Sequence, residues 1–443
     1  MLSREDNELV TRVGAGTPMG NLMRQYWVPA MLSSELPTPD SDPVRVMLLG
    51  EQLIAFRDTN GNVGLLQNNC PHRGASLFFG RNEEAGLRCV YHGWKFSTDG
   101  TCVDMPNEPA ESDFKQKVKA TAYPCTERGG VVWTYMGPRQ QPPPLPDLEP
   151  NMASDSDVQL VAVQRECNWL QGLEGDIDTS HLGFLHLGAV QPEDTRPGTF
   201  AYYTVNDRAP HYNVVDTEYG AMYGAYRPGP EEQLYWRFAQ FLFPFYAMIP
   251  TGVMGLQKLV RAWVPMDDTH MMFYSMGSQA SAIQSQNVNA NRRMPSGGGA
   301  VPRVLMTPNT SDWYGRFRMA ASASNDYMID RDKQRRREDY TGIPGIHTQD
   351  QAVTESMGTI YDREKERLGT SDVMVIRVRR RLMDAARALA ERGVTPPGVD
   401  NPEVYRVRSG GAFLPKGADW IEGTAELRKA FVEHPELDPA LAG

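Results

Sequence analysis

CPHRGASLFFGRNEEAGLRCVYHGWKF, residues 70–96, is the stretch that decides the fold. It contains a Cys-x-His pair, Cys70 and His72, then sixteen residues, then a Cys-x-x-His pair, Cys89 and His92. Two thiolates and two imidazoles therefore lie in two short segments of chain. Such a set can hold a [2Fe-2S] cluster in which Cys binds one iron and His replaces Cys on the other.

Zinc is the alternative occupant of a Cys2His2 set. Zinc sites of this composition usually keep both Cys in one pair and both His in the other, whereas each pair here mixes Cys with His. Pro71, Gly74, Gly93 and Trp94 suit two tight loops that meet over a cluster, with backbone N–H groups near sulfur and an aromatic ring that excludes water. The sequence therefore predicts a cluster rather than zinc.

The composition is that of an ordinary globular protein of more than one domain: 443 residues, 40% hydrophobic and 23% charged. A formal net charge of -10 argues against a nucleic-acid partner. The first residues carry charge without an apolar core of a signal peptide, and the most apolar segment, 241–255, is too short to span a bilayer. We expect a cytoplasmic protein without a membrane partner, in which Cys102, Cys125 and Cys167 stay reduced.

Changes in hydrophobic period divide the chain into four segments. We expect an N-terminal helical segment over 1–40, a strand-rich cluster domain over 41–136, a proline-rich linker over 137–150 and a catalytic domain over 151–443. Strands are predicted in the last segment at 202–205, 234–238, 255–264 and 271–276, and a loop at 279–302. The predicted fold class is α+β, with an antiparallel sheet around helices in the second half.

A second metal site is predicted between residues 168 and 186. Asp178, His181 and His186 form D-x-x-H-x-x-x-x-H, and two His with a carboxylate can hold non-haem Fe(II) with open positions. On a regular helix His181 and His186 would lie roughly 140° apart, which is too far for one ion. We therefore expect the helix to end or bulge near Gly183, so that His186 turns inward.

Together the two motifs resemble the oxygenase α subunit of Rieske non-haem iron oxygenases. This resemblance implies an all-β Rieske [2Fe-2S] domain, a C-terminal helix-grip catalytic domain, and iron held by two His and a distant carboxylate. In that family the Asp of D-x-x-H, here Asp178, bridges to the cluster of a neighbouring subunit. Asp326 in SNDYMIDRDKQ resembles the family's downstream segment and is the preferred third ligand, with Asp330 as its rival.

The segments EDNELVTRVGAGTPMGNLMRQYWVPA and QDQAVTESMGTIYDREKERLG resemble the phthalate dioxygenase-like branch over nearly the full length. The resemblance implies cis-dihydroxylation of an aromatic ring, such as a phthalate or halobenzoate, with O2 and with electrons from a flavin and ferredoxin-type NAD(P)H reductase. It also implies a homotrimer or stacked trimers. Monooxygenation or O-demethylation is the alternative reaction. A carboxylate would need an Arg clamp, for which Arg208, Arg227 and Arg237 are candidates, and Ser180 could bind a substrate oxygen.

Overall fold

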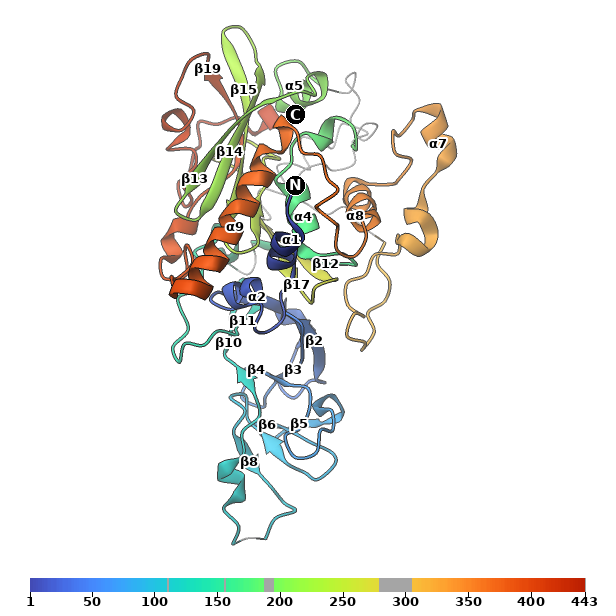
Figure 1. The fold of residues 1–443 in the computed structure, drawn as a ribbon, viewed down its shortest axis with the longest axis vertical. Helices are drawn as coiled ribbons and strands as arrows, with labels where there is room; N and C mark the ends of the chain where they lie inside the picture. Colours follow the sequence, from blue (N-terminus) through green and yellow to red (C-terminus); the bar gives the residue numbers. More distant parts are fainter. Residues whose placement is uncertain (110, 155–156, 187–194, 279–304, 443) are drawn as a thin grey trace.

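The computed structural model describes residues 1–109, 111–154, 157–186, 195–278 and 305–442. Four sheets form two unequal parts, with three smaller sheets in the first third of the chain and one large sheet in the remainder (Figure 1). The arrangement confirms the predicted α+β class. Among the described residues, no helix has both the length and the apolar content needed to cross a bilayer. The predicted loop at 279–302 lies outside the described residues.

The N-terminal segment is helical only in part. It contains α1 (Arg4–Thr11) and α2 (Pro18–Met23), which begin at the side-chain caps Ser3 and Thr17. The prediction of a helical segment up to residue 40 is wrong beyond α2, because the buried apolar run of β1 (Trp27–Leu32) pairs with β11 (Val131–Tyr135). This strand therefore joins the start of the chain to the end of the strand-rich segment.

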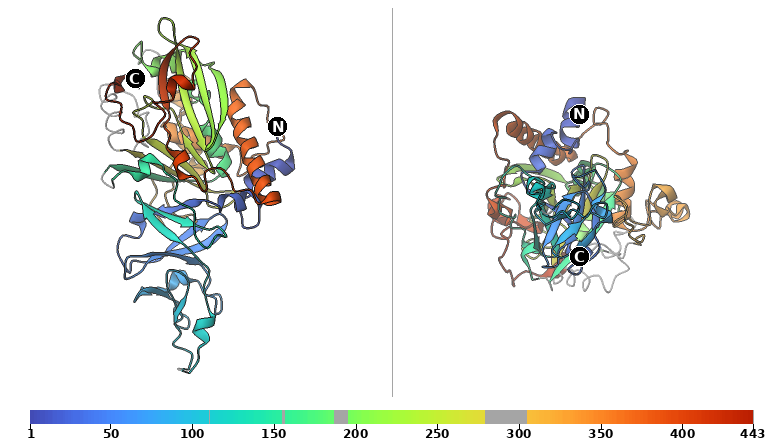
Figure 2. Two further views of the ribbon diagram at one scale, coloured as in Figure 1. Left: turned by 90° about the vertical axis from the view of Figure 1, so that its left-hand side faces the viewer. Right: turned by 90° about the horizontal axis from the view of Figure 1, so that it is seen from below.

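The first third of the chain is built from three antiparallel sheets. One sheet has the order β1-β11-β10, a second β2-β3-β4-β9 and a third β5-β6-β7-β8. The remaining bounds are β2 (Val44–Leu48), β3 (Glu51–Arg57), β4 (Val63–Gln67), β5 (Arg81–Glu83), β6 (Gly86–Arg88), β7 (Lys95–Phe96), β8 (Cys102–Asp104), β9 (Ala122–Tyr123) and β10 (Cys125–Arg128). The sheet β5–β8 lies at the end of the molecule remote from the large sheet, as both side views show (Figures 1 and 2).

Residues 137–148 form neither helix nor strand, as the density of proline predicts, and α3 (Glu149–Met152) follows. Trp27 anchors this segment, since its indole N–H donates to the carbonyl of Pro143 at 2.6 Å. The two parts also meet at Leu49 and Gly50, whose N–H groups donate to the carbonyls of Pro265 and Met266. The three predicted boundaries between the four segments stay a prediction.

The large sheet is antiparallel and eight-stranded, in the order β12-β18-β17-β16-β15-β14-β13, with β19 paired to β15. Its strands are β12 (Val158–Arg165), β13 (His211–Thr217), β14 (Gly220–Pro228), β15 (Gln233–Leu242), β16 (Tyr246–Met248), β17 (Leu259–Pro265), β18 (Met271–Ser278) and β19 (Gly410–Pro415). The helices of this part are α4 (Trp169–Asp176), α5 (Phe200–Asn206), α7 (Arg331–Arg336), α8 (Ile346–Ser356) and α9 (Val373–Arg392).

One predicted strand is a helix. Residues 202–205 are rich in aromatic and β-branched side chains, which favours a strand, but they lie in α5. Thr199 caps this helix, and the ring of Phe200 packs on Tyr235 of β15 with centroids 4.8 Å apart. The cap and this tertiary contact therefore override the local strand preference.

Helix α4 packs against β16 and β17, and the close approach occurs at Gly172. A Cβ atom there would lie 2.3 Å from the Cε3 atom of Trp263 on β17 and 2.6 Å from the Cε atom of Met271. Glu174 of the same helix pairs with Arg379 of α9, so α4 is held between the sheet and α9. The end of α4 is consequently fixed in position.

We expect Gly172→Ala to destabilise the protein by about 1–3 kcal/mol, because the added methyl group overlaps Trp263. Gly175→Ala is the matched control in the same helix, since its Cβ would meet only Thr354 at 3.9 Å. This control should leave stability unchanged or raise it by about 0.5–1 kcal/mol. Urea unfolding of the two variants measures the difference, and equal midpoints would contradict the packing argument.

Candidate functional site

Two loops of matching geometry carry the four Cys and His residues of the N-terminal motif. In each loop the Cys N–H donates to the carbonyl five residues later, and a glycine N–H four residues later donates back to the Cys carbonyl. The glycines are Gly74 and Gly93, with φ values of 77° and 79°. Only glycine adopts this left-handed conformation without strain, which explains the spacing of each loop.

The four side chains converge between these loops. The rings of His72 and His92 meet edge to face with centroids 4.4 Å apart, and Cys70 and Cys89 are both buried. Trp94 stacks on His72 at 4.3 Å. Burial raises the pKa of the Cys70 thiol to about 11, so a thiolate at Cys70 requires positive charge beside it, as iron would supply. The donor set therefore fits a [2Fe-2S] cluster with two Cys and two His.

A second set of donors lies where α4 ends. The helix stops at Asp176, and His181 opens a short 3-10 turn, His181–Gly183. The two His rings lie edge to face with centroids 5.1 Å apart. His186 therefore does approach His181, as expected. The helix, however, ends at Asp176, earlier than the end or bulge predicted near Gly183.

Asp350 of α8 completes this second set. One donor atom each from His181, His186 and Asp350 lie within 4.8 Å of one another. The Oδ1 atom of Asp350 is 3.8 Å from His181 Nε2 and 3.4 Å from His186 Nε2. Two imidazoles and one carboxylate around a single point fit a non-haem iron, and open positions remain for other ligands.

The structure brings neither Asp326, the expected third ligand, nor its rival Asp330 to this donor set. Asp326 is exposed, in a turn with left-handed φ of 49°, and does not line the cavity described below. Asp330 caps α7, where its Oδ1 accepts from the N–H groups of Asp332 and Lys333. The sequence argument overlooked Asp350, although it lies in the segment that carries the branch resemblance.

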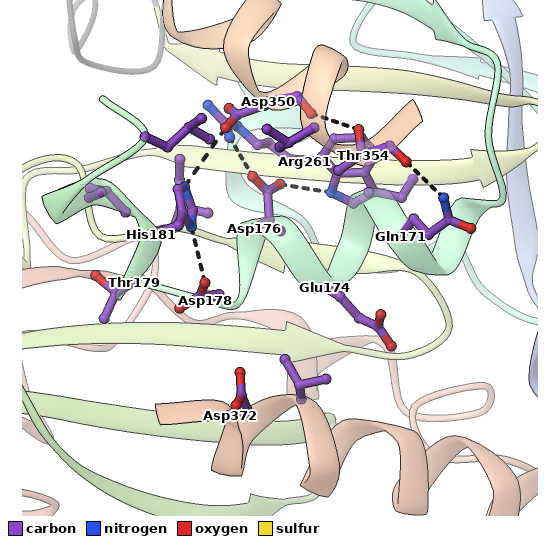
Figure 3. Close-up of a pocket in the computed structure, with 18 of the residues that line it drawn as sticks. Gln171, Glu174, Asp176, Asp178, Thr179, His181, Arg261, Asp350, Thr354 and Asp372 are labelled. Carbon is purple, nitrogen blue, oxygen red and sulfur yellow. Dashed lines mark hydrogen bonds and ion pairs between the residues drawn. The ribbon is translucent and has the colours of Figure 1, made fainter. Parts of the chain in front are cut away.

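Asp178 is not part of this donor set but contacts one of its members. Its Oδ2 is 3.3 Å from His181 Nδ1, and its Oδ1 accepts from the N–H of Ser180 at 2.7 Å. His181 therefore lies between Asp178 and Asp350 (Figure 3). Burial alone would lower the pKa of His181, but the hydrogen bond to Asp178 and the charge of Asp350 outweigh it and raise that pKa.

The other two members of the set are shifted in the opposite direction. Burial lowers the pKa of His186. Burial acts to raise the pKa of Asp350, but the adjacent His186 and His181 outweigh it and the carboxyl pKa is lowered. Near neutral pH Asp350 is therefore an anion and His186 a neutral imidazole, which are the forms that bind a metal ion.

A cavity of about 360 Å³ adjoins the donor set and is of the size that small ligands occupy. Its walls come from α4, the turn after it, β15, β17, α8 and α9 (Figure 3). His347 also lines it, and burial lowers the pKa of this imidazole to about 3. His347 is thus a neutral part of the cavity wall.

Of the residues predicted to contact the substrate, only Arg237 lines the cavity. Arg237 of β15 lines the cavity and is 7% exposed, and its Nε donates to Thr179 Oγ1 at 2.9 Å. Arg227 is buried but does not line the cavity, and Arg208 is exposed, over the ring of Phe184 and away from the cavity walls. The hydroxyl of Ser180 bonds to Tyr212 at 2.5 Å instead of facing the cavity.

Among the described residues, no carboxylate lies within ion-pair distance of Arg237. Its contacts beyond Thr179 are long, at 3.5 Å to Thr204 Oγ1 and 3.4 Å to the Tyr235 hydroxyl. A buried guanidinium without an anionic partner is costly, so its donors are available to an anion that enters the cavity.

The family models that match are the Rieske [2Fe-2S] domain, over residues 26–124, and the LigXa C-terminal domain like family, over residues 134–440. The chain is 47% identical to the 3-chlorobenzoate-3,4-dioxygenase oxygenase subunit of Comamonas testosteroni, over 95% of this chain and 97% of that protein. It is 37% identical to the phthalate 4,5-dioxygenase oxygenase subunit of Pseudomonas putida, over 95% and 94% of the two chains.

Among solved structures, dicamba monooxygenase bound to dicamba aligns with 84% of this chain and all of that one, with a TM-score of 0.59 and 17% identity. At this identity the likeness shows a shared fold. The sequence matches cover both halves of the chain, so the cluster motif and the second donor set belong to one continuous architecture.

We expect Gly93→Ala to lose more of the cluster than Gly74→Ala. Alanine is strained by about 1–2 kcal/mol at the left-handed φ of both positions. At Gly93 the added Cβ would also lie 2.6 Å from Pro106 Cγ, whereas at Gly74 it meets nothing within 4 Å. Acid-labile sulfide per chain and visible circular dichroism report the retained cluster. Equal retention in the two variants would show that the contact with Pro106 is unimportant.

Proposed function

We propose that this chain, which belongs to the Rieske non-haem iron ring-hydroxylating oxygenases as an oxygenase (α) subunit, adds both atoms of O2 to the ring of an aromatic carboxylate. The observation that carries the substrate class is Arg237, a buried guanidinium without an anionic partner in the cavity beside His181 and His186. The relatives named for 3-chlorobenzoate and phthalate act on substrates of this kind.

The residues proposed to hold the two metal centres follow from the geometry. Cys70, Cys89, His72 and His92 would hold the [2Fe-2S] cluster, and His181, His186 and Asp350 would hold the mononuclear iron. When bound, these groups supply electrons and the activation of dioxygen. The work of the protein itself is to position the ring and to limit the access of water.

Arg237 would bind the substrate carboxylate through parallel N–H donors and so fix which ring carbons face His181 and His186. Thr179 holds the guanidinium in place through its contact with Nε. Asp178, next in sequence, holds Nδ1 of His181 and presents this ligand to the iron. We also propose that Asp178 conducts the electron from a cluster that lies outside its own subunit.

This electron path supports an assembly of several copies. In one chain the first cluster loop leads from β4 towards β5 and the second joins β6 to β7, and the sheet β5–β8 lies at the end of the molecule remote from α4 and α8 (Figures 1 and 2). Val90 and Tyr91, beside His92, are exposed hydrophobic side chains. We propose a cytoplasmic homotrimer or stacked trimers in which the cluster of one copy serves the iron of the next. Its electrons would come from a flavin and ferredoxin-type NAD(P)H reductase.

A single turnover of the pre-reduced protein under isotopically labelled dioxygen tests this function. A panel of benzoates, phthalates and aryl ethers serves as substrate, and products are identified by mass. Two labelled oxygen atoms in a ring diol are expected. One labelled atom, with formaldehyde released from an aryl methyl ether, would instead establish monooxygenation or O-demethylation at the same metal sites.

We expect Asp350→Asn to remove the mononuclear iron and leave the cluster in place. Iron should fall from about three to about two atoms per chain while sulfide stays at about two, since only one site is affected. Asp326→Asn is the matched control and should keep all of the iron. Loss of iron from the Asp326 variant but not from the Asp350 variant would reverse the ligand assignment.

We expect Arg237→Met to lower kcat/KM for a benzoate by about 10- to 100-fold, because charge-assisted hydrogen bonds to the carboxylate are lost. The effect should vanish for the corresponding neutral benzamide, which separates recognition of charge from damage to the site. Arg208→Met, at the exposed arginine, is the control and should leave both values unchanged. Equal losses for benzoate and benzamide would contradict the clamp.

A further inference from the structure

A directional chain of hydrogen bonds reaches His186 from the loop that precedes α8. The side chain of Gln349 is completely buried, and its Oε1 is 2.8 Å from His186 Nδ1. Its Nε2 is 2.9 Å from the Ile343 carbonyl and 3.1 Å from Thr341 Oγ1. Gln349 thus joins one proposed iron ligand to a loop that does not itself line the cavity.

The Ile343 carbonyl fixes which end of the Gln349 amide faces His186. A carbonyl oxygen can only accept, so the Gln349 atom beside it must be the amide nitrogen. The remaining amide atom, Oε1, can also only accept, and it faces Nδ1 of His186. His186 must therefore carry a hydrogen on Nδ1.

Thr341 reinforces the same direction. Its Oγ1 lies 3.0 Å from Oδ1 of Asp339, a carboxylate that only accepts when ionised, and it also receives the N–H of Ile343 at 3.0 Å. The single hydroxyl hydrogen is committed to an acceptor, so Oγ1 accepts from Gln349 Nε2. His186 therefore donates to Gln349, Gln349 donates to Thr341, and Thr341 donates to Asp339.

We propose that Gln349, oriented by Ile343 and Thr341, is a positioning residue that fixes the tautomer of His186. A neutral ring with hydrogen on Nδ1 has its lone pair on Nε2, the nitrogen that faces Asp350 Oδ1 at 3.4 Å. Two electron-pair donors then face each other across a gap that a cation would fill. The proposal rests on the proposed iron site and is independent of the proposed substrate and reaction.

The two histidines consequently have different partners. His181 has a carboxylate, Asp178, at its Nδ1, whereas His186 has a neutral amide. A neutral acceptor orients the ring without adding a negative charge to a site that already holds Asp350 and Asp178. Gln349 therefore orients His186, whereas the proposed transfer of the electron involves Asp178 and His181.

Binding of Co(II) or Fe(II) to protein that retains its cluster but lacks the mononuclear iron tests this inference. Gln349→Leu should weaken metal binding by about 10- to 100-fold, the usual effect of losing a hydrogen-bond partner of a metal-binding His. Gln349→Glu can still accept from Nδ1 and should bind the metal more tightly than the Leu variant. Unchanged affinity in Gln349→Leu, or equal losses in the Leu and Glu variants, would overturn the proposal.

Two further measurements keep the test independent of folding and of function. Thr341→Val should weaken metal binding, whereas Thr341→Ser, which keeps the hydroxyl group, should not. The ¹⁵N resonances of His186 in metal-free native protein should show hydrogen on Nδ1. Hydrogen on Nε2 would overturn the proposal even if the metal site is correct, whereas failure of the iron assignment would appear in the metal content of Asp350→Asn.

Discussion

The structure depends on bringing one carboxylate oxygen, Oδ1 of Asp350, to within 4 Å of the Nε2 atoms of two histidines. An anion in such a half-buried place is stabilised by groups of complementary charge or by a metal ion. The neighbouring elements serve this requirement. Close packing at Gly172 fixes α4 on the sheet, the helix ends before His181, and α8 presents Asp350 and Gln349 from the other side.

Charge around the cavity is arranged so that α4 contributes no free carboxylate. Glu174 bonds to Arg379 and to Arg363, and Asp176 bonds to Arg261. Arg237, by contrast, has no carboxylate partner among the residues that the structure describes. Asp178 and Asp350 place negative charge beside the histidines, and the unpaired guanidinium of Arg237, bonded to Thr179, adds positive charge to the same cavity. An anionic aromatic substrate would complete this balance.

The sequence predicted the parts of the site that are close together in the chain. Spacing and flanking residues predicted the Cys and His pairs of the cluster motif, and spacing with an assumed helix break predicted His181 and His186, because these residues are close together in the chain. The structure also confirms the strand-rich first third of the chain and the antiparallel sheet of the second half, both of which hydrophobic period predicted. The spacing of the two histidines also required a break in the helix before His186, although the break is earlier than predicted.

The carboxylate and the partner of His186 could not be predicted in this way. Gln349 and His186 are 163 residues apart, and their contact depends on how α8 packs against α4. Asp326, Asp330 and Asp350 are the same type of residue, so only the tertiary fold distinguishes them. Likewise, Arg237 differs from Arg208 because it is buried and has no anionic partner among the described residues, and neither feature can be read from the sequence.

The most direct test of this account is X-ray diffraction from crystals of the iron-loaded protein, measured on both sides of the iron absorption edge. Besides the cluster signal between Cys70 and Cys89, the account predicts one anomalous peak bonded to His181, His186 and Asp350. A peak bonded to the two histidines and to a carboxylate other than Asp350, or the absence of a peak at the histidines, would contradict it.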